Sequence, residues 1–432
     1  MPGVSVSWIG ALVGLALAII LILRRLNPVY ALLLGAVIGS LVGGANLVQT
    51  TQIVITGSQS VMGTVVRVIA AGVLAGAMME SGAADVIART IVNKLGDNMA
   101  IFALALATML ITSVGVFITV SIIIVAPIAM AVGKKLNISK LALLVALSGG
   151  GKAGNIISPN PNTIAAASGF HIETSALMIA DFVPALFGLA MAVLVASLLR
   201  NKGEMPTDRD IVEKEEENQN HPSVGASFVA PVVAIVLLLI NPIGEILHVH
   251  ALEAFQVDAM YILPFAGIVG ILAMKQGKHI MDYTRAGLMR MTDVVLILIG
   301  AGAIGGLISS SNLSVEIVKL INEAGISGTL LAPIAGILMA AATASTSTGV
   351  ILGTGSFGKT ILSFGVSPVG AAVMMHTGAT VIDELPHGNY FHVTGNAMHM
   401  DIKQRLRVIP YEAIVGLTMT IVGTIMYGYL MK

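Results

Sequence analysis

The sequence predicts an all-α integral membrane protein made of two inverted repeats, with about ten transmembrane helices, two helical hairpins and broken helices at the site. The composition is the first observation, because 56% of the 432 residues are hydrophobic and only 11% are charged. A soluble domain does not have this composition. The second observation is that helix-breaking residues interrupt two apolar stretches, and the third is that the pattern of the first half recurs in the second.

Apolar runs and their breaks define the first repeat, residues 1–199. A run of about 20 apolar residues is enough for a helix to cross a bilayer. The predicted elements are helices at 6–23, 28–45, 61–79 and 176–199, an amphipathic segment at 83–95, a hairpin at 99–133 with its turn at 112–115, and a broken helix at 140–169.

The stretch 148–163, SGGGKAGNIISPNPNT, lies inside this broken helix. Its glycines and its two prolines, Pro159 and Pro161, disfavour an uninterrupted helix. Unpaired peptide groups are costly in lipid, so a broken backbone persists there only when protein or a water-filled cavity surrounds it. Transporters place their substrates at such breaks, and we expect the same here.

A charged segment, 200–223, is interpreted as a solvated cytoplasmic linker between the two halves. The second repeat, 224–432, then resembles the first at an offset of about 228 residues. Its predicted elements are helices at 224–240, 259–274 and 292–308, an amphipathic segment at 310–325, a hairpin at 327–364 and a broken helix at 367–395.

The lysines and arginines predict the orientation of these elements. Placing the N- and C-termini outside collects nearly all basic residues on the cytoplasmic side, as the positive-inside rule requires. The two hairpins then enter from opposite sides, which makes the repeats inverted. Basic and acidic side chains number 23 each, so no nucleic-acid surface is expected, and the absence of cysteine excludes thiol chemistry.

Three segments carry a resemblance to a known family. They are ITSVGVFITVSIIIVAPIAMAVGKKLNISKLALLVALSGG, the P-x-P step at Pro159 and Pro161, and GVSPVGAAVMMHTGATVIDELPHGNYF. The chain resembles the gluconate permease family, GntP, of the ion-transporter superfamily. It is a divergent member, because the family's PPHPGP is replaced by SPNPNT at 158–163. The resemblance implies proton-coupled import of small sugar acids, a bacterial inner-membrane location, a homodimer and elevator-like motion.

Candidate substrate ligands lie in the two breaks and at the hairpin tips. Lys152 is the lysine of the first break. Three interpretations of it are open: it contacts an anionic substrate, it pairs permanently with Asp383 or Glu384, or it extends to a surface. The other candidates are hydroxyl, amide and glycine residues that could bind a carboxylate or sugar hydroxyls, although each could equally satisfy or pack the backbone. They are Ser113, Gly151, Asn155, Asn160, Asn162, Thr163, Ser345, Thr346, Ser347 and Thr377.

The second break holds the candidates for proton coupling. Asp383 and Glu384 are adjacent, and His387 follows three residues later. Adjacent carboxylates raise the proton affinity of one of them, and a histidine exchanges protons near neutral pH. The alternative is a buried ion pair or a helix cap.

Other functions remain open at this point. Carboxylates with hydroxyls and exposed carbonyls can hold sodium, so a sodium-coupled carboxylate carrier or a sodium/proton antiporter is the first alternative. A membrane enzyme is the second, although no catalytic triad is apparent. His387, His392 and His399 are spaced five and seven residues apart, which does not align them on one helical face. No metal site or cofactor is expected beyond the coupling ion.

Overall fold

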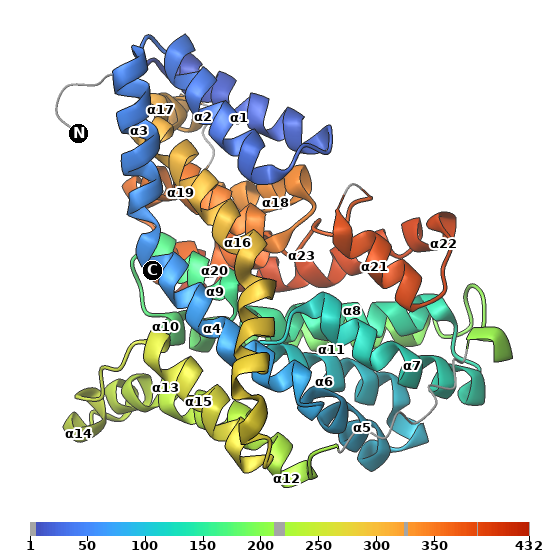
Figure 1. Ribbon diagram of the computed structural model, residues 1–432. Coiled ribbons are helices and arrows are strands. Elements are labelled where there is room, and N and C mark those ends of the chain that lie inside the picture. The colour runs from blue at the N-terminus through green and yellow to red at the C-terminus, as the bar shows by residue number, and fades with distance from the viewer. Residues whose placement is uncertain (1–5, 211–220, 324–326, 387, 432) are drawn as a thin grey trace.

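The computed structural model describes residues 6–210, 221–323, 327–386 and 388–431, and their regular structure is helical (Figure 1). One isolated β-bridge, between Val6 and Ser311, is the exception in these ranges. The predicted all-helical class is therefore confirmed. By length and composition, five of the described helices could cross a membrane, or up to eight if each bent pair counts as one span. The expected total of about ten spans stays a prediction.

The first half contains eleven helices. Their bounds are α1 Trp8–Leu23, α2 Pro28–Val42, α3 Leu47–Ser60, α4 Met62–Glu80, α5 Ala83–Leu95, α6 Ala100–Ser113, α7 Ile118–Leu136, α8 Lys140–Ile156, α9 Pro161–Gly169, α10 Thr174–Ala180 and α11 Phe182–Leu198. The sequence did not predict α3, because half of its residues are polar and no apolar run marks it.

The second half begins with four helices: α12 Val224–Ser227, α13 Val229–Leu247, α14 His250–Glu253 and α15 Ala259–Ala273. Eight more follow: α16 Ile280–Ser309, α17 Leu313–Glu323, α18 Leu331–Thr343, α19 Thr346–Ser363, α20 Pro368–Gly378, α21 Asn389–Ala397, α22 Ile402–Leu406 and α23 Ile409–Ile425. From α5 and from α17 onward the two halves run in the same order: an amphipathic helix, a hairpin, two helices separated by a break, and a short helix followed by a long one. The last two helices are bent in the first half, whereas residues 402–430 of the second half form one candidate span.

Two helix boundaries differ from those predicted. α16 begins at Ile280 rather than at residue 292, because the arginines and Asp293 in its first half mask the apolar pattern. The helix predicted at 176–199 is two helices, α10 and α11, which meet at Asp181 and are bent by 46°. Pro184 in the first turn of α11 has no N–H to donate to a carbonyl of α10, which favours a bend there.

The first break is also shorter than predicted. The three glycines lie inside α8, and the helix is interrupted only over residues 157–160. The glycines allow α8 to pack directly on the backbone of α6: a Cβ added at Gly150 would lie 2.0 Å from the carbonyl oxygen of Ala105. These residues therefore provide close helix packing rather than an unwound loop.

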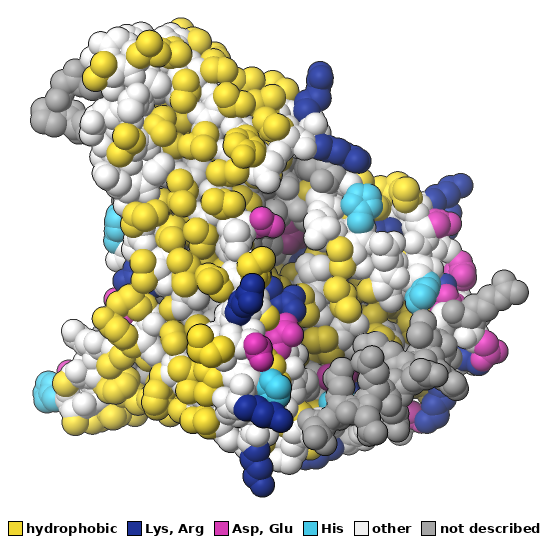
Figure 2. Space-filling model, viewed as in Figure 1, with side chains coloured by type: hydrophobic (Ala, Val, Ile, Leu, Met, Phe, Trp, Pro, Cys, Tyr) yellow, Lys and Arg dark blue, Asp and Glu magenta, His cyan; other side chains and the backbone are white. Residues whose placement is uncertain are grey.

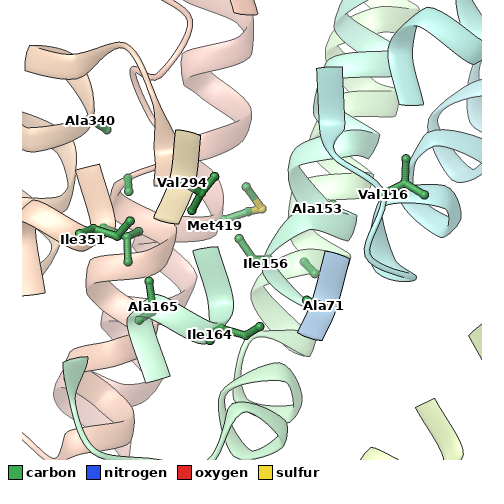
Figure 3. Close-up of a cluster of buried hydrophobic side chains, with 14 of the residues drawn as sticks. Ala71, Val116, Ala153, Ile156, Ile164, Ala165, Val294, Ala340, Ile351 and Met419 are labelled. Carbon is green, nitrogen blue, oxygen red and sulfur yellow. The ribbon is translucent and has the colours of Figure 1, made fainter. Parts of the chain in front are cut away.

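Apolar side chains surround the broken helix (Figure 3). Ala153 and Ile156 of α8 and Ile164 of α9 are fully buried, and Met419 of α23 and Val294 of α16 lie in the same cluster. The outer surface is apolar as well (Figure 2): on α15, Tyr261, Phe265 and Leu272 are each more than half exposed. A chain whose core and surface are both apolar is one whose solvent is lipid.

The linker is partly docked onto the helices instead of being fully solvated. The ammonium group of Lys140, at the start of α8, is buried and donates to Asp210 (2.8 Å), to Glu204 (3.3 Å) and to the carbonyl oxygen of His399 (3.2 Å). Residues 201–210 thus bind to both halves of the chain, and residues 211–220 lie outside the described ranges.

We expect Asp210→Asn to destabilise the protein by roughly 1–3 kcal/mol at neutral pH, because Lys140 loses its charged partner. Burial opposes ionisation of Asp210, but hydrogen bonds from Lys140 and Thr207 outweigh burial and lower the pKa of its carboxyl group. A lowered pKa means that the stabilisation is present above the unfolded-state pKa and is lost as pH falls through the folded-state value.

Thermal unfolding of wild type and Asp210→Asn across pH should therefore show a constant difference from about pH 5 to 8 that narrows below about pH 4. Asp208→Asn is the matched control, because the Asp208 side chain is 89% exposed where it pairs with Lys134. Its effect should be near zero. An equal effect of both substitutions would contradict the docked role of Asp210.

Candidate substrate and ion site

The two breaks meet at Lys152. Its ammonium group, 1% exposed, lies 2.7 Å from Asp383 Oδ1 and 3.1 Å from Glu384 Oε2. It also donates to the carbonyl oxygen of Thr380 at 2.6 Å. Glu384 Oε2 in turn accepts from the backbone N–H of Asp383 at 2.7 Å. A side chain of the first half is thus enclosed by backbone and carboxylates of the second.

This cluster carries one cation and two carboxylates, so its net charge is −1 when both acids are ionised and zero when one is protonated. Glu384 is fully buried and its Oε1 has no hydrogen-bond partner within the described residues. A buried uncompensated charge is costly, which favours the state that holds a proton. The arrangement is chemically suited to taking up and releasing one proton.

The tip of the second hairpin contacts both breaks. The hydroxyl of Thr346 donates to the carboxylate of Asp383, and the hydroxyl of Ser347 donates to the side-chain oxygen of Asn162. Ser345 caps α19 by accepting from the backbone N–H of Thr348. A displacement of this tip would therefore change the surroundings of both Asp383 and Asn162.

The asparagines of the first break fall into two groups. Asn160 donates to the side-chain and backbone oxygens of Asn155, both at 2.7 Å, and accepts from the N–H groups of Asn162 and Thr163. These bonds satisfy the broken backbone and begin α9, which is the N-cap role that asparagine commonly fills. Asn155 and Asn162, in contrast, also face a cavity.

That cavity has a volume of about 590 Å³ and is lined by both halves of the chain. The volume lies in the range of small-molecule sites. The predicted site residues that line it are Asn155, Asn162, Ser345, Thr346, Ser347 and Asp383.

Other predicted residues lie elsewhere. Lys152 and Glu384 belong to the ion cluster next to Asp383 but do not line the cavity, and His387 lies outside the described residues. The remaining candidates are also absent from the lining: Ser113, Gly151, Asn160, Thr163 and Thr377. Two of them use their hydroxyls within their own helices, because Ser113 donates to the carbonyl oxygen of Leu110 and Thr377 donates to that of Val373.

The sequence analysis missed the contribution of the early helices. Arg25 and Asn27, between α1 and α2, line the cavity, as does Asp293 of α16. Arg25 was interpreted only as a cytoplasmic flanking charge, and its left-handed backbone (φ 66°) cannot be read from sequence. Asp293 had a usable signal, because a carboxylate inside a membrane helix indicates a functional position. Thr119, Tyr390 and His392 line the cavity too.

Within the described residues, no group of three or more histidine, aspartate or glutamate side chains is arranged to hold a metal ion. The polar groups that line the cavity are hydroxyls, amides, the carboxylates of Asp293 and Asp383, the guanidinium of Arg25 and the imidazole of His392, and the Lys152 ion cluster lies next to Asp383.

An apolar helical chain in which broken helices from two halves meet beside a polar cavity is a multi-pass membrane transporter. The family model described as GntP family permease matches residues 6–430. The chain therefore belongs to the GntP family of permeases, and the resemblance seen in the sequence is confirmed.

Individual relatives agree with this assignment. An uncharacterized transporter of Haemophilus influenzae is 47% identical over 98% of this chain and 99% of its own. The gluconate permease of Pseudomonas aeruginosa is 25% identical over 80% of each chain. The D-serine transporter DsdX of Escherichia coli is 23% identical over 85% of this chain and 86% of its own.

A solved structure has a similar fold. The YdaH transporter of Alcanivorax borkumensis matches with a TM-score of 0.64 at 14% identity, over 89% of this chain and 90% of its own. This likeness is one of fold alone.

Proposed function

We propose that the protein is a secondary active transporter that imports a small hydroxy acid such as gluconate together with a proton. The observation that carries the proposal is the buried cluster of one lysine and two carboxylates beside a polar cavity. The gluconate permease among the relatives supports the substrate class. The D-serine transporter has a substrate that also combines a carboxylate with a hydroxyl.

Charge balance gives the coupling mechanism. With both acids ionised the cluster is net negative and repels an anion. A proton on one of the two carboxylates neutralises the cluster and frees Lys152 from one of its two partners. An anion that enters with this proton leaves the total charge of the site at −1, the value of the ionised empty cluster, whereas an anion that entered without the proton would bring it to −2. Proton and anion therefore bind together and leave together.

The remaining cavity residues supply the contacts a sugar acid needs. Asn155, Asn162 and the hydroxyls of Ser345 and Ser347 can donate to and accept from substrate hydroxyls. Arg25 adds positive potential to the lining.

The architecture proposed with this function is a pair of inverted repeats, residues 1–199 and 224–432, in the bacterial inner membrane with both termini outside. The common order of elements in the two halves supports the repeats, and the meeting of the two breaks supports a site between them. A homodimer and an elevator-like motion belong to the same proposal.

Uptake of labelled gluconate into proteoliposomes tests the function. A proton gradient with the acidic side outside the vesicles should drive accumulation of gluconate inside them. Asp383→Asn or Glu384→Gln should remove this response to the gradient. Asp282→Asn is the control, because Asp282 is an exposed carboxylate at the start of α16 (side chain 77% exposed) and should leave uptake unchanged.

Three outcomes would contradict the proposal. Unchanged proton dependence in both variants would exclude these carboxylates as the coupling site. Accumulation driven by a sodium gradient and not by protons would favour a sodium-coupled carrier. Recovery of chemically altered substrate would favour an enzyme. A parallel thermal-shift screen of sugar acids, D-serine and small carboxylates would identify the substrate.

A further inference from the structure

A second buried titratable pair lies apart from the Lys152 cluster. His376 of α20 and Asp181, the residue at which α10 and α11 meet, are both 0% exposed, and Nδ1 of the histidine lies 2.7 Å from Oδ2 of the aspartate. The pair joins the end of the first half to the broken helix of the second. The sequence analysis assigned it no role, because the two residues are 195 positions apart.

The second polar atom of each side chain is unused. His376 Nε2 and Asp181 Oδ1 are buried and have no hydrogen-bond partner within the described residues. Buried polar atoms are usually bonded, and a reaction or exchange step is one explanation for those that are not. The free ring nitrogen and the free carboxylate oxygen leave this pair able to take up or release a proton.

The surroundings do not neutralise a charge on this pair. On α23 and its continuation, Tyr427 is the titratable neighbour that interacts electrostatically with Asp181. A phenol is neutral at physiological pH, so the charge of the pair is set by its own protons. With a proton on each ring nitrogen the pair is a neutral imidazolium carboxylate, and with one of these protons lost its net charge is −1.

The pair is close to the ion cluster along the chain. His376 precedes Thr380 by four residues, and α20 ends between them at Gly378. The carbonyl oxygen of Thr380 accepts from Lys152, and its hydroxyl donates to the carbonyl of Thr377 at 2.7 Å. A short polar segment therefore separates His376 from the proposed coupling site.

Neither His376 nor Asp181 lines the Arg25 cavity. In Figure 1, α10 and α20 lie near the C-terminus, while α21 and α22 lie on the opposite side of the molecule. α10 follows His171, which lines a second cavity of about 480 Å³ bounded by α3, α16 and α19. Ala165 and Ser168 of α9 also line this cavity, and α9 packs against both α10 and α20, so the helices next to the pair reach the second cavity.

We propose that His376 and Asp181 form a proton relay that loads the carboxylates of Asp383 and Glu384 from the side of the second cavity. A proton binds His376 Nε2, and the resulting imidazolium is held through Nδ1 by the Asp181 carboxylate. One or more intervening waters then carry the proton from Nε2 to an ionised carboxylate of the cluster, which returns the imidazole to its neutral form. The inference rests on the proposed proton symport.

Two transport assays on the full-length protein separate a relay from a structural role. The first is accumulation of labelled gluconate driven by a pH gradient, and the second is gluconate exchange at equal pH on both sides. His376→Gln and Asp181→Asn should each lower accumulation at least tenfold while exchange stays within about twofold of wild type. His279→Gln, at a half-exposed histidine, is the control for both assays.

Accumulation at the wild-type level in either variant would overturn the relay. So would equal loss of both activities in variants that keep the wild-type melting temperature. If a single substitution unfolds the protein, the double variant His376→Leu with Asp181→Leu replaces the pair with apolar groups of similar size, a change buried pairs often tolerate, and allows the same comparison. Wild-type protein that exchanges gluconate but fails to accumulate it would contradict the proposed function itself.

Discussion

Lys152→Met is expected to abolish uptake and to destabilise the protein by about 3–5 kcal/mol, the usual cost of removing one partner of a buried ion pair. The substitution leaves Asp383 and Glu384 side by side in the interior without a cation. Methionine fills a similar space, so the loss of charge dominates the result. Uptake in proteoliposomes and thermal unfolding of the purified protein measure the two effects.

Further variants separate the structural effect of Lys152 from the functional one. In the triple variant Lys152→Met, Asp383→Asn, Glu384→Gln no charge remains, so much of the stability should return while uptake stays absent. Lys278→Met, at an exposed lysine before α16, should change neither property. Wild-type uptake by Lys152→Met would exclude the cluster from transport.

Arg405→Met is expected to have the second-largest effect, a loss of about 3–5 kcal/mol in the free energy of unfolding. Arg405, 1% exposed, forms two hydrogen bonds to the fully buried Glu412, at 2.6 and 3.2 Å. Its guanidinium also lies 5.7 Å from the ring centre of Tyr390 and 5.1 Å from that of Phe391. Tyr390 lines the substrate cavity, so we also expect weaker substrate binding.

Thermal unfolding and the KM for uptake measure these changes. Arg407→Met, two residues away and exposed, is the control and should alter stability by less than about 0.5 kcal/mol. If Arg405→Met changes the stability no more than Arg407→Met does, the pair of Arg405 with Glu412 does not stabilise the region of the second break.

Helix positions were largely predictable from sequence because lipid imposes a strong pattern. α5 was predicted at its observed bounds, since its apolar and charged faces alternate clearly. The start of α16 was not, because Asp282, Arg285 and Arg290 interrupt the apolar pattern there. The length of the first break was overestimated because a glycine that permits close packing looks the same in sequence as one that ends a helix.

The candidate site was predictable where a residue lies in a break or at a hairpin tip. Asp383, Asn162 and Ser347 were found in this way, and all three line the cavity. The pairing of Lys152 with Asp383 was foreseen as one alternative, but choosing it required knowing that the two breaks meet. The contact between Asp181 and His376 was beyond reach, because Pro184 can indicate a bend near Asp181 but no local signature indicates the packing of α10 on α20.

The packing of α8 on α6 determines which surfaces can move. A Cβ at Gly150 would overlap the α6 backbone, whereas one at Gly305 of α16 would lie 3.3 Å from the carbonyl oxygen of Gly355 in α19. The first contact interlocks two backbones, so the first hairpin and its neighbouring helix are expected to travel as a rigid block. The contact between Gly305 of α16 and Gly355 of α19 involves small residues, so a displacement of one helix along the other would not be blocked by large side chains there.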